Sequence, residues 1–262
     1  MNTIIKGTDP RITIRGMTDV LAPIGLTLPA AVTDAPAPVT VPDPDSAEIA
    51  AAIKAAKGDP AADKTVQRLI TARAIARGGY TDLLARTARE EQWHALTDAL
   101  DTINTQIHDV FDNAARELEA VAPALKGYTD LDTIVLASLP ARDADPARRA
   151  INAQHTLRAA HTAWLKLWRS VGGQQTGRPE ADILAVCNPT PTEWLEHASR
   201  RPHTLPDPGD VWTPARYGWT LTLAHDLRAA KARADHIRTT IDRDRDKRQA
   251  EQGRLSGWGL RR

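Results

Sequence analysis

TDLLARTAREEQWHALTDALDTINTQIHDVFDNAARELEAVA, residues 81–122, contains neither Gly nor Pro and is the stretch that decides the fold. Apolar residues follow one another in it at spacings of four and three, the repeat that places side chains along one face of a long helix. This seam consists of Leu96, Leu100, Ile103, Ile107, Val110, Ala114, Leu118, Val121 and Leu125. The pattern predicts a coiled coil or a long helical hairpin.

Two further long helices are predicted, at residues 146–171 and 214–252. Pro146 begins the first of these, because proline fits the first turn of a helix, and Gly172-Gly173 ends it. The second has apolar residues at the same spacings, namely Leu223, Leu227, Ala230, Ala234, Ile237 and Ile241. With shorter helices predicted from Ser46 to Lys57 and from Pro60 to Arg77, we expect an all-α fold of long antiparallel helices in a helical hairpin or bundle.

The domain organisation follows from where Pro and Gly gather. Residues 46–173 form the predicted helical domain, and residues 174–213 an irregular connection that contains Pro and Trp, with a short helix at Thr192 to Arg200. The last helix then leads into a peptide-like tail, residues 253–262.

Residues 1–45 are predicted to be an extended, Pro-rich arm, since they hold seven of the 18 prolines. Inside the arm, residues 11–15 (RITIR) alternate polar and apolar with period two, which indicates one short strand. A single strand cannot bury a core, so the arm is either a disordered tail or an element that orders against a neighbouring subunit. In the second case Ile12 and Ile14 are candidate partner-binding residues.

Composition excludes several classes of protein. No stretch approaches the roughly 18 consecutive apolar residues of a membrane-spanning helix, and no signal peptide opens the chain, so we expect neither a membrane protein nor a secreted one. The net charge of +1 argues against extensive nucleic-acid binding. The 44 Ala residues and the excess of Arg over Lys are typical of a high-GC genome, and Ala favours long helices that gain stability by packing on one another.

No residue pattern indicates catalysis, a metal or a cofactor. Glu91 and His94 have the Glu-x-x-His spacing of di-iron bundles, but the second copy that such a site needs is missing, so both residues are expected to face solvent. His155, His161, His225 and His236 match no metal or catalytic template and are expected at a helix surface or boundary. The single cysteine, Cys187, lacks the surroundings of a thiol enzyme and is expected to be a small buried apolar residue. We therefore expect a protein that is not an enzyme.

The tail, GRLSGWGLRR, has the composition of a short docking peptide. Its apolar side chains could occupy pockets on a protein partner while its arginines add charge. The candidate binding residues are Leu255, Trp258, Leu260, Arg261 and Arg262. The segment 259–262 (GLRR) is similar to the C-terminal cargo-loading peptides of encapsulin nanocompartments, although the serine of those peptides is missing and Trp258 is added.

The Pro-rich arm, the Ala-rich long helices and the peptide-like terminus together resemble structural and assembly proteins of actinobacterial phages. This resemblance implies a capsid-associated, scaffolding or connector subunit in a virion or in the host cytoplasm, with protein subunits as partners. An adaptor or cargo that docks to a protein shell through its C-terminal peptide is the alternative. A nucleic-acid-binding protein that uses the basic residues from Arg243 to Arg262 is a further one.

Overall fold

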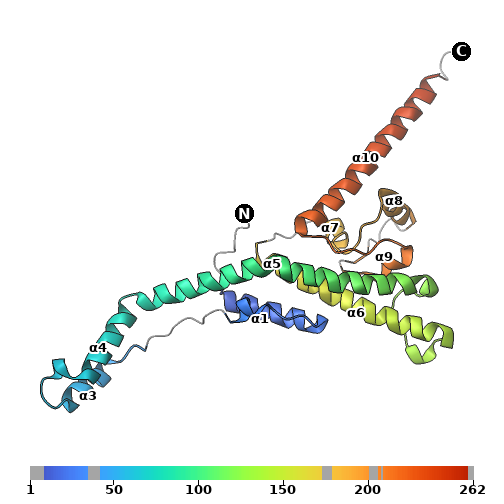
Figure 1. The fold of residues 1–262 in the computed structure, drawn as a ribbon. Coiled ribbons are helices and arrows are strands. Elements are labelled where there is room, and N and C mark those ends of the chain that lie inside the picture. The colour runs from blue at the N-terminus through green and yellow to red at the C-terminus, as the bar shows by residue number, and fades with distance from the viewer. Residues whose placement is uncertain (1–8, 35–41, 173–178, 201–205, 208, 259–262) are drawn as a thin grey trace. The chain divides into compact units, whose positions relative to one another are not determined.

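The computed structural model describes residues 9–34, 42–172, 179–200, 206–207 and 209–258, and this part of the chain is predominantly helical. The helices are α1 (Pro10–Leu21), α2 (Ala30–Thr33), α3 (Ser46–Ala55), α4 (Lys64–Arg77), α5 (Tyr80–Val121), α6 (Ala141–Ser170), α7 (Pro179–Ile183), α8 (Pro191–Arg200), α9 (Trp212–Tyr217) and α10 (Leu227–Trp258) (Figure 1). Short 3-10 turns lie between them: η1 (Ala22–Ile24), η2 (Pro60–Ala62), η3 (Ala122–Leu125) and η4 (Leu136–Ser138). None of the helices among these residues is long and apolar enough to cross a membrane.

The chain divides into two compact units, and the boundary between them falls inside α1 and α5. Unit 1 consists of residues 1–6, 15–28 and 100–262. Unit 2 consists of residues 7–14 and 29–99. Each unit is described here by itself.

The core of unit 1 is built on the apolar seam of α5. From Leu100 to Leu125 every residue of the predicted seam is buried except Val110, which is half-buried. Phe111, the single Phe of the chain, lies fully buried among them. The periodic pattern therefore predicted both the helix and its buried face.

Helix α6 contributes a second apolar face to unit 1. It runs beside α5, where the Arg149 guanidinium pairs with the Glu117 carboxylate (Figure 1). The face consists mostly of small side chains together with Leu157, Trp164 and Leu167. The helix begins at Ala141, five residues before the predicted start, because the Pro140 carbonyl accepts the N–H groups of Asp143 and Ala144 and so forms a first turn ahead of Pro146.

The last helix begins at Leu227, so the predicted start at residue 214 is wrong. Residues 212–217 form the separate helix α9, which ends at Gly218, whose φ of 81° is readily accessible only to Gly. The chain then crosses residues 185–188, with an isolated antiparallel bridge between Cys187 and Leu221. The local apolar spacing could not show this, because the crossing is set by a segment some 35 residues away in the sequence.

Arg233 of α10 holds this crossing together. Its Nη1 donates to the carbonyl oxygens of Leu184 (3.0 Å), Cys187 (3.2 Å) and Thr222 (2.9 Å), and its Nη2 donates to that of Leu223 (3.4 Å). Burial lowers the pKa of its guanidinium, which is half-buried. A single side chain thus satisfies carbonyl groups from both of the crossing segments.

The apolar stripe of α10 covers only its first half. Leu227, Ala230, Ala234 and Ile237 are buried, as their spacing predicts. From residue 242 to residue 252 all side chains but one are exposed. This second half carries four basic and four acidic residues, which leaves it with no net charge.

The N-terminal strand predicted for residues 11–15 is wrong, because these residues lie in helix α1. Asp9 begins the helix: its carboxylate accepts the N–H of Arg11 at 3.0 Å and its carbonyl accepts that of Ile12. The buried residues of α1 are Pro10, Thr13, Met17 and Leu21, at spacings of three and four. The five residues 11–15 alternate with a period of two, which is too short a stretch to distinguish a strand from a helix. Over the twelve residues of α1 the buried positions follow the period of a helix.

Unit 2 contains a short helical hairpin, formed by α3, η2 and α4. Asp45 begins α3 with a capping box, in which its carboxylate accepts the N–H of Glu48 and the Glu48 carboxylate accepts the N–H of Asp45. Asp63 begins α4 by accepting the N–H groups of Thr65 and Val66. These caps fix the ends of the helices through local contacts alone.

Candidate functional site

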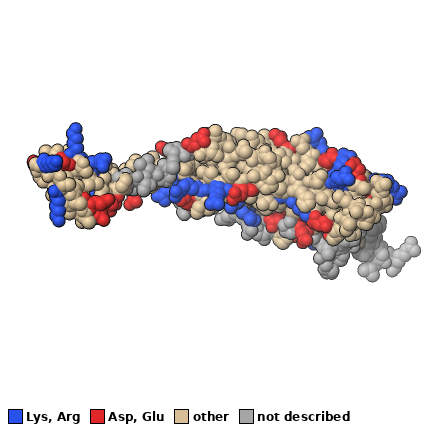
Figure 2. All heavy atoms as spheres, turned by 90° about the horizontal axis from the view of Figure 1, so that it is seen from below, with Lys and Arg blue, Asp and Glu red and all other residues tan. Residues whose placement is uncertain are grey.

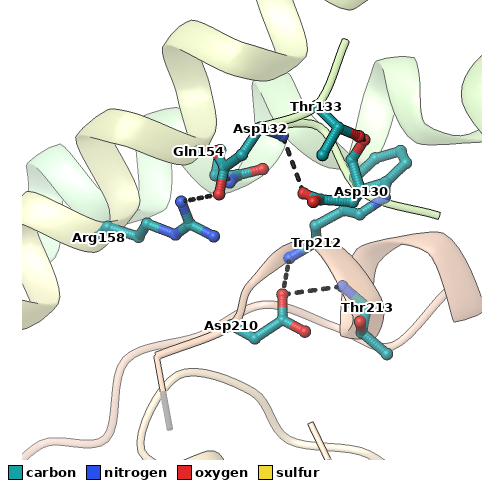
Figure 3. A network of polar contacts seen from close by, with 8 residues as sticks. All are labelled: Asp130, Asp132, Thr133, Gln154, Arg158, Asp210, Trp212 and Thr213. Carbon is teal, nitrogen blue, oxygen red and sulfur yellow. Dashed lines mark hydrogen bonds and ion pairs between the residues drawn. The ribbon is translucent and has the colours of Figure 1, made fainter. Parts of the chain in front are cut away.

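A network of polar contacts joins loops to helices in unit 1 (Figure 3). The Asp132 carboxylate accepts Gln154 Nε2 at 2.9 Å and Arg158 Nη1 at 2.6 Å, which attaches the loop after η3 to α6. Nearby, Asp210 accepts the N–H groups of Trp212 and Thr213 at 2.9 and 3.2 Å and so caps α9. Through these contacts the two carboxylates hold loop segments against the helices.

His161 differs from the prediction that it lies at a helix surface or boundary. His161 of α6 is buried, with 6% of its surface exposed, and its ring stacks on Trp164 with centroids 5.9 Å apart. Burial lowers the pKa of His161 to about 4, so the ring is neutral near pH 7. His94, His155, His225 and His236 are exposed as predicted, as is Glu91.

Neither a metal site nor a reactive thiol is found among the described residues. No group of three or more His, Cys, Asp or Glu side chains in that part of the chain could hold a metal ion. Cys187 is buried, as expected, and burial raises the pKa of its thiol to about 12. A thiol with such a pKa is protonated at neutral pH and is a poor nucleophile.

Exposed apolar side chains give a clearer indication of function, and they gather in unit 2. Of the seven large apolar side chains that are exposed in the described part of the chain, six belong to this unit. They are between 42% and 68% exposed and comprise Ile12, Ile53, Ile70, Tyr80, Leu83 and Leu84. Apolar surface of this kind is typical of protein contact sites.

The hairpin of unit 2 also has almost no core of its own. In the range 46–77, which is described without a gap, Val66 is the one buried residue. Helices of 10 and 14 residues are marginal in water unless an apolar face is covered. A further surface that covered Ile53 and Ile70 would therefore add stability to the hairpin.

A groove of about 260 Å³ opens in unit 1 between α7, α8 and α10. Its apolar part is formed by Leu184, Trp194, Ala234, Ile237 and Ile241. Arg238 and Glu180, 3.7 Å apart, lie beside it as an ion pair. This groove is open and combines both charge signs, so it has no strong preference for an anion or a cation.

Charged side chains do not gather by sign on the face that Figure 2 shows. Lys and Arg side chains lie there among Asp and Glu side chains, with broad uncharged areas between them. Nucleic-acid binders instead concentrate their basic residues in a patch or stripe.

Only two of the residues predicted to contact a partner have described side chains. Ile12 is 68% exposed and is available for contact, whereas Ile14 is half-buried. Leu255 and Trp258 continue helix α10, and their side chains are outside the described part of the chain. Leu260, Arg261 and Arg262 lie outside the described residues altogether.

The sequence analysis did not identify Ile53, Ile70, Tyr80, Leu83 and Leu84 as exposed apolar residues. A signal was present for the last three, because Tyr80, Leu83 and Leu84 are spaced as one apolar face at the start of α5, ahead of the seam that was noted.

No protein family, curated protein or solved structure matches the chain.

Proposed function

We propose that this chain is a non-enzymatic structural or assembly protein of a phage virion or a phage-derived particle. In this role unit 2 and the terminal arms, residues 1–45 and 253–262, contact other protein subunits. The long helices pair in antiparallel fashion and set the spacing between these contact sites.

The observation that carries the proposal is the apolar surface of unit 2. Six large apolar side chains are exposed there, and the α3–α4 hairpin buries a single residue. A subunit that works inside a larger assembly has such a surface because its neighbours complete the core. The placement in a particle follows from the resemblance in composition and build to phage assembly proteins.

Particle association of the full chain tests the proposal. Tagged protein is produced in the organism that encodes it, particles are separated by density gradient, and the chain is quantified in each fraction by mass spectrometry. We expect the chain to sediment with particles. Recovery only in the soluble fractions contradicts the proposal.

Matched variants locate the contact in unit 2. The double variant Ile70→Asp/Leu83→Asp places two charges on the exposed apolar surface, and we expect at least a tenfold loss from the particle fraction. Val135→Asp is the control, because Val135 is equally exposed, at 64%, but belongs to unit 1. Circular dichroism confirms that each variant keeps its helix content. Equal incorporation of both variants would exclude unit 2 as the contact surface.

A further inference from the structure

We infer that α3 pairs with α3 of a second copy of this chain, in antiparallel direction, about a two-fold axis at Ala51. This inference rests on the proposed function in that it names one partner of unit 2, a second copy of the chain. It is tested below by a measurement that does not involve particles.

The outward face of α3 is made of alanine. Ile49, Ala52 and Ala56 are half-buried on the side that packs on α4. Ala47, Ala51 and Ala55 are exposed and follow one another at intervals of four, so they form a stripe along the opposite side. Small side chains let two helices approach at the short end of the usual 8–10 Å range of interaxial distances.

The sequence of this segment is mirror-related about Ala51. In DSAEIAAAIKAAK, residues 45–57, Ala47 and Ala55 lie four positions on either side of the centre, and Ile49 and Ile53 lie two. The charged residues are mirror-related as well: Asp45 and Lys57 lie six positions on either side of Ala51, and Glu48 and Lys54 lie three. Each acidic residue before Ala51 therefore has a basic residue at the mirror position after it.

This mirror relation is what a two-fold contact uses. In an antiparallel pair centred on Ala51, each residue lies at the height of its mirror residue in the other copy. The acidic first half of one α3 then faces the basic second half of the other, and the two helix dipoles oppose each other favourably. A contact with a different protein would require no relation between the two halves of α3, so the pattern favours a second copy.

The energetic need for such a contact comes from the hairpin itself. With Val66 as the one buried residue between 46 and 77, a second α3 would cover the alanine stripe in both copies. Two ten-residue helices bury less than the roughly 800 Å² per partner of a standard interface. We therefore expect a weak, concentration-dependent dimer with a Kd on the order of micromolar.

Sedimentation of the purified full chain tests the inference. The average mass is expected to rise from that of the 28.5 kDa monomer towards twice that value as the concentration increases. Glu48→Lys and Lys54→Glu each place like charges at the same height in the pair, so each should raise the Kd about tenfold or more. The double variant Glu48→Lys/Lys54→Glu again has opposite charges at each height and should restore the dimer.

The restoration distinguishes a second copy from any other partner, because exchanging two charges on one protein would not recover contact with an unchanged partner. Arg243→Glu, a charge reversal on exposed α10, is the control and should leave the Kd unchanged. Since Glu48→Lys also removes the capping box, Ala51→Glu offers a variant with intact caps that should abolish the dimer.

A monomer at all concentrations, or a double variant that stays as weak as the single ones, would overturn the inference. In that case the proposed function would remain supported if the unsubstituted chain still sedimented with particles and the Ile70→Asp/Leu83→Asp variant failed to do so.

Discussion

Replacing Arg233 by Ala should loosen the crossing of residues 184–188 and 220–224 in unit 1. Arg233 donates to four carbonyl oxygens, and three of these contacts are 3.2 Å or shorter. The substitution leaves these carbonyl groups without their donor and removes a half-buried side chain from the crossing. Hydrogen bonds from a charged donor contribute about 1.5–3 kcal/mol each, and water replaces part of that loss. Because Nη1 has two hydrogens for three acceptors, we expect a loss of about 3 kcal/mol in the free energy of unfolding of unit 1.

Cys187 provides a local assay for this change. It is the single cysteine of the chain, it is buried, and its carbonyl is one of the acceptors of Arg233. A thiol reagent reaches it only when the crossing opens, so the labelling rate reports the opening equilibrium. A loss of about 3 kcal/mol should raise this rate roughly 100-fold. Urea unfolding followed by circular dichroism measures the total stability in parallel.

Arg228→Ala is the matched control, since Arg228 lies on α10 five residues earlier and is exposed. Its substitution should change stability by no more than about 0.5 kcal/mol and leave thiol labelling unchanged. If Arg233→Ala labelled Cys187 at the rate of the unsubstituted chain, the idea that Arg233 holds the crossing would be refuted.

Two further predictions concern pH and the tail. The pKa of His161 is about 4 in the folded chain and 6.5 as its ordinary value, so the unfolded state takes up the proton first as the pH falls. Stability from this residue is therefore complete above pH 6.5 and is lost between pH 6.5 and 4, by up to about 3 kcal/mol. Urea unfolding at pH 7 and at pH 5 measures how much the free energy of unfolding decreases between the two pH values. This decrease should be smaller by about 2 kcal/mol in His161→Phe than in the unsubstituted chain. An equal decrease in both proteins would contradict the role given to His161. Fusing residues 253–262 to an unrelated soluble protein tests the adaptor alternative: we expect no recovery of the fusion with particles, whereas recovery would favour docking through the tail.

Helices with long, regular patterns were predictable because their signals are local. The seam of α5 extends over some 30 residues, so its period is unambiguous, and the same holds for the first half of α10. At α1 the signal was equally local but was missed. The Asp-Pro pair from which a helix start was predicted at residue 146 also occurs at Asp9-Pro10, and the buried positions Thr13, Met17 and Leu21 have helical spacing.

The contact surface could be predicted only in part. The sequence identified Ile12 as a partner-binding candidate, and this side chain is exposed. It could not identify Ile53 or Ile70, since an apolar residue on a helix is exposed or buried according to what packs on it.

The sequence by itself thus determined the helical class, the long helices and their apolar faces, because the period of apolar residues depends on the backbone geometry of the helix alone. Only the tertiary structure decided that α10 starts at Leu227, that His161 is buried and that Arg233 joins two crossing segments. Each of these depends on groups brought together from positions up to about 50 residues apart, and a local pattern carries no information about such neighbours.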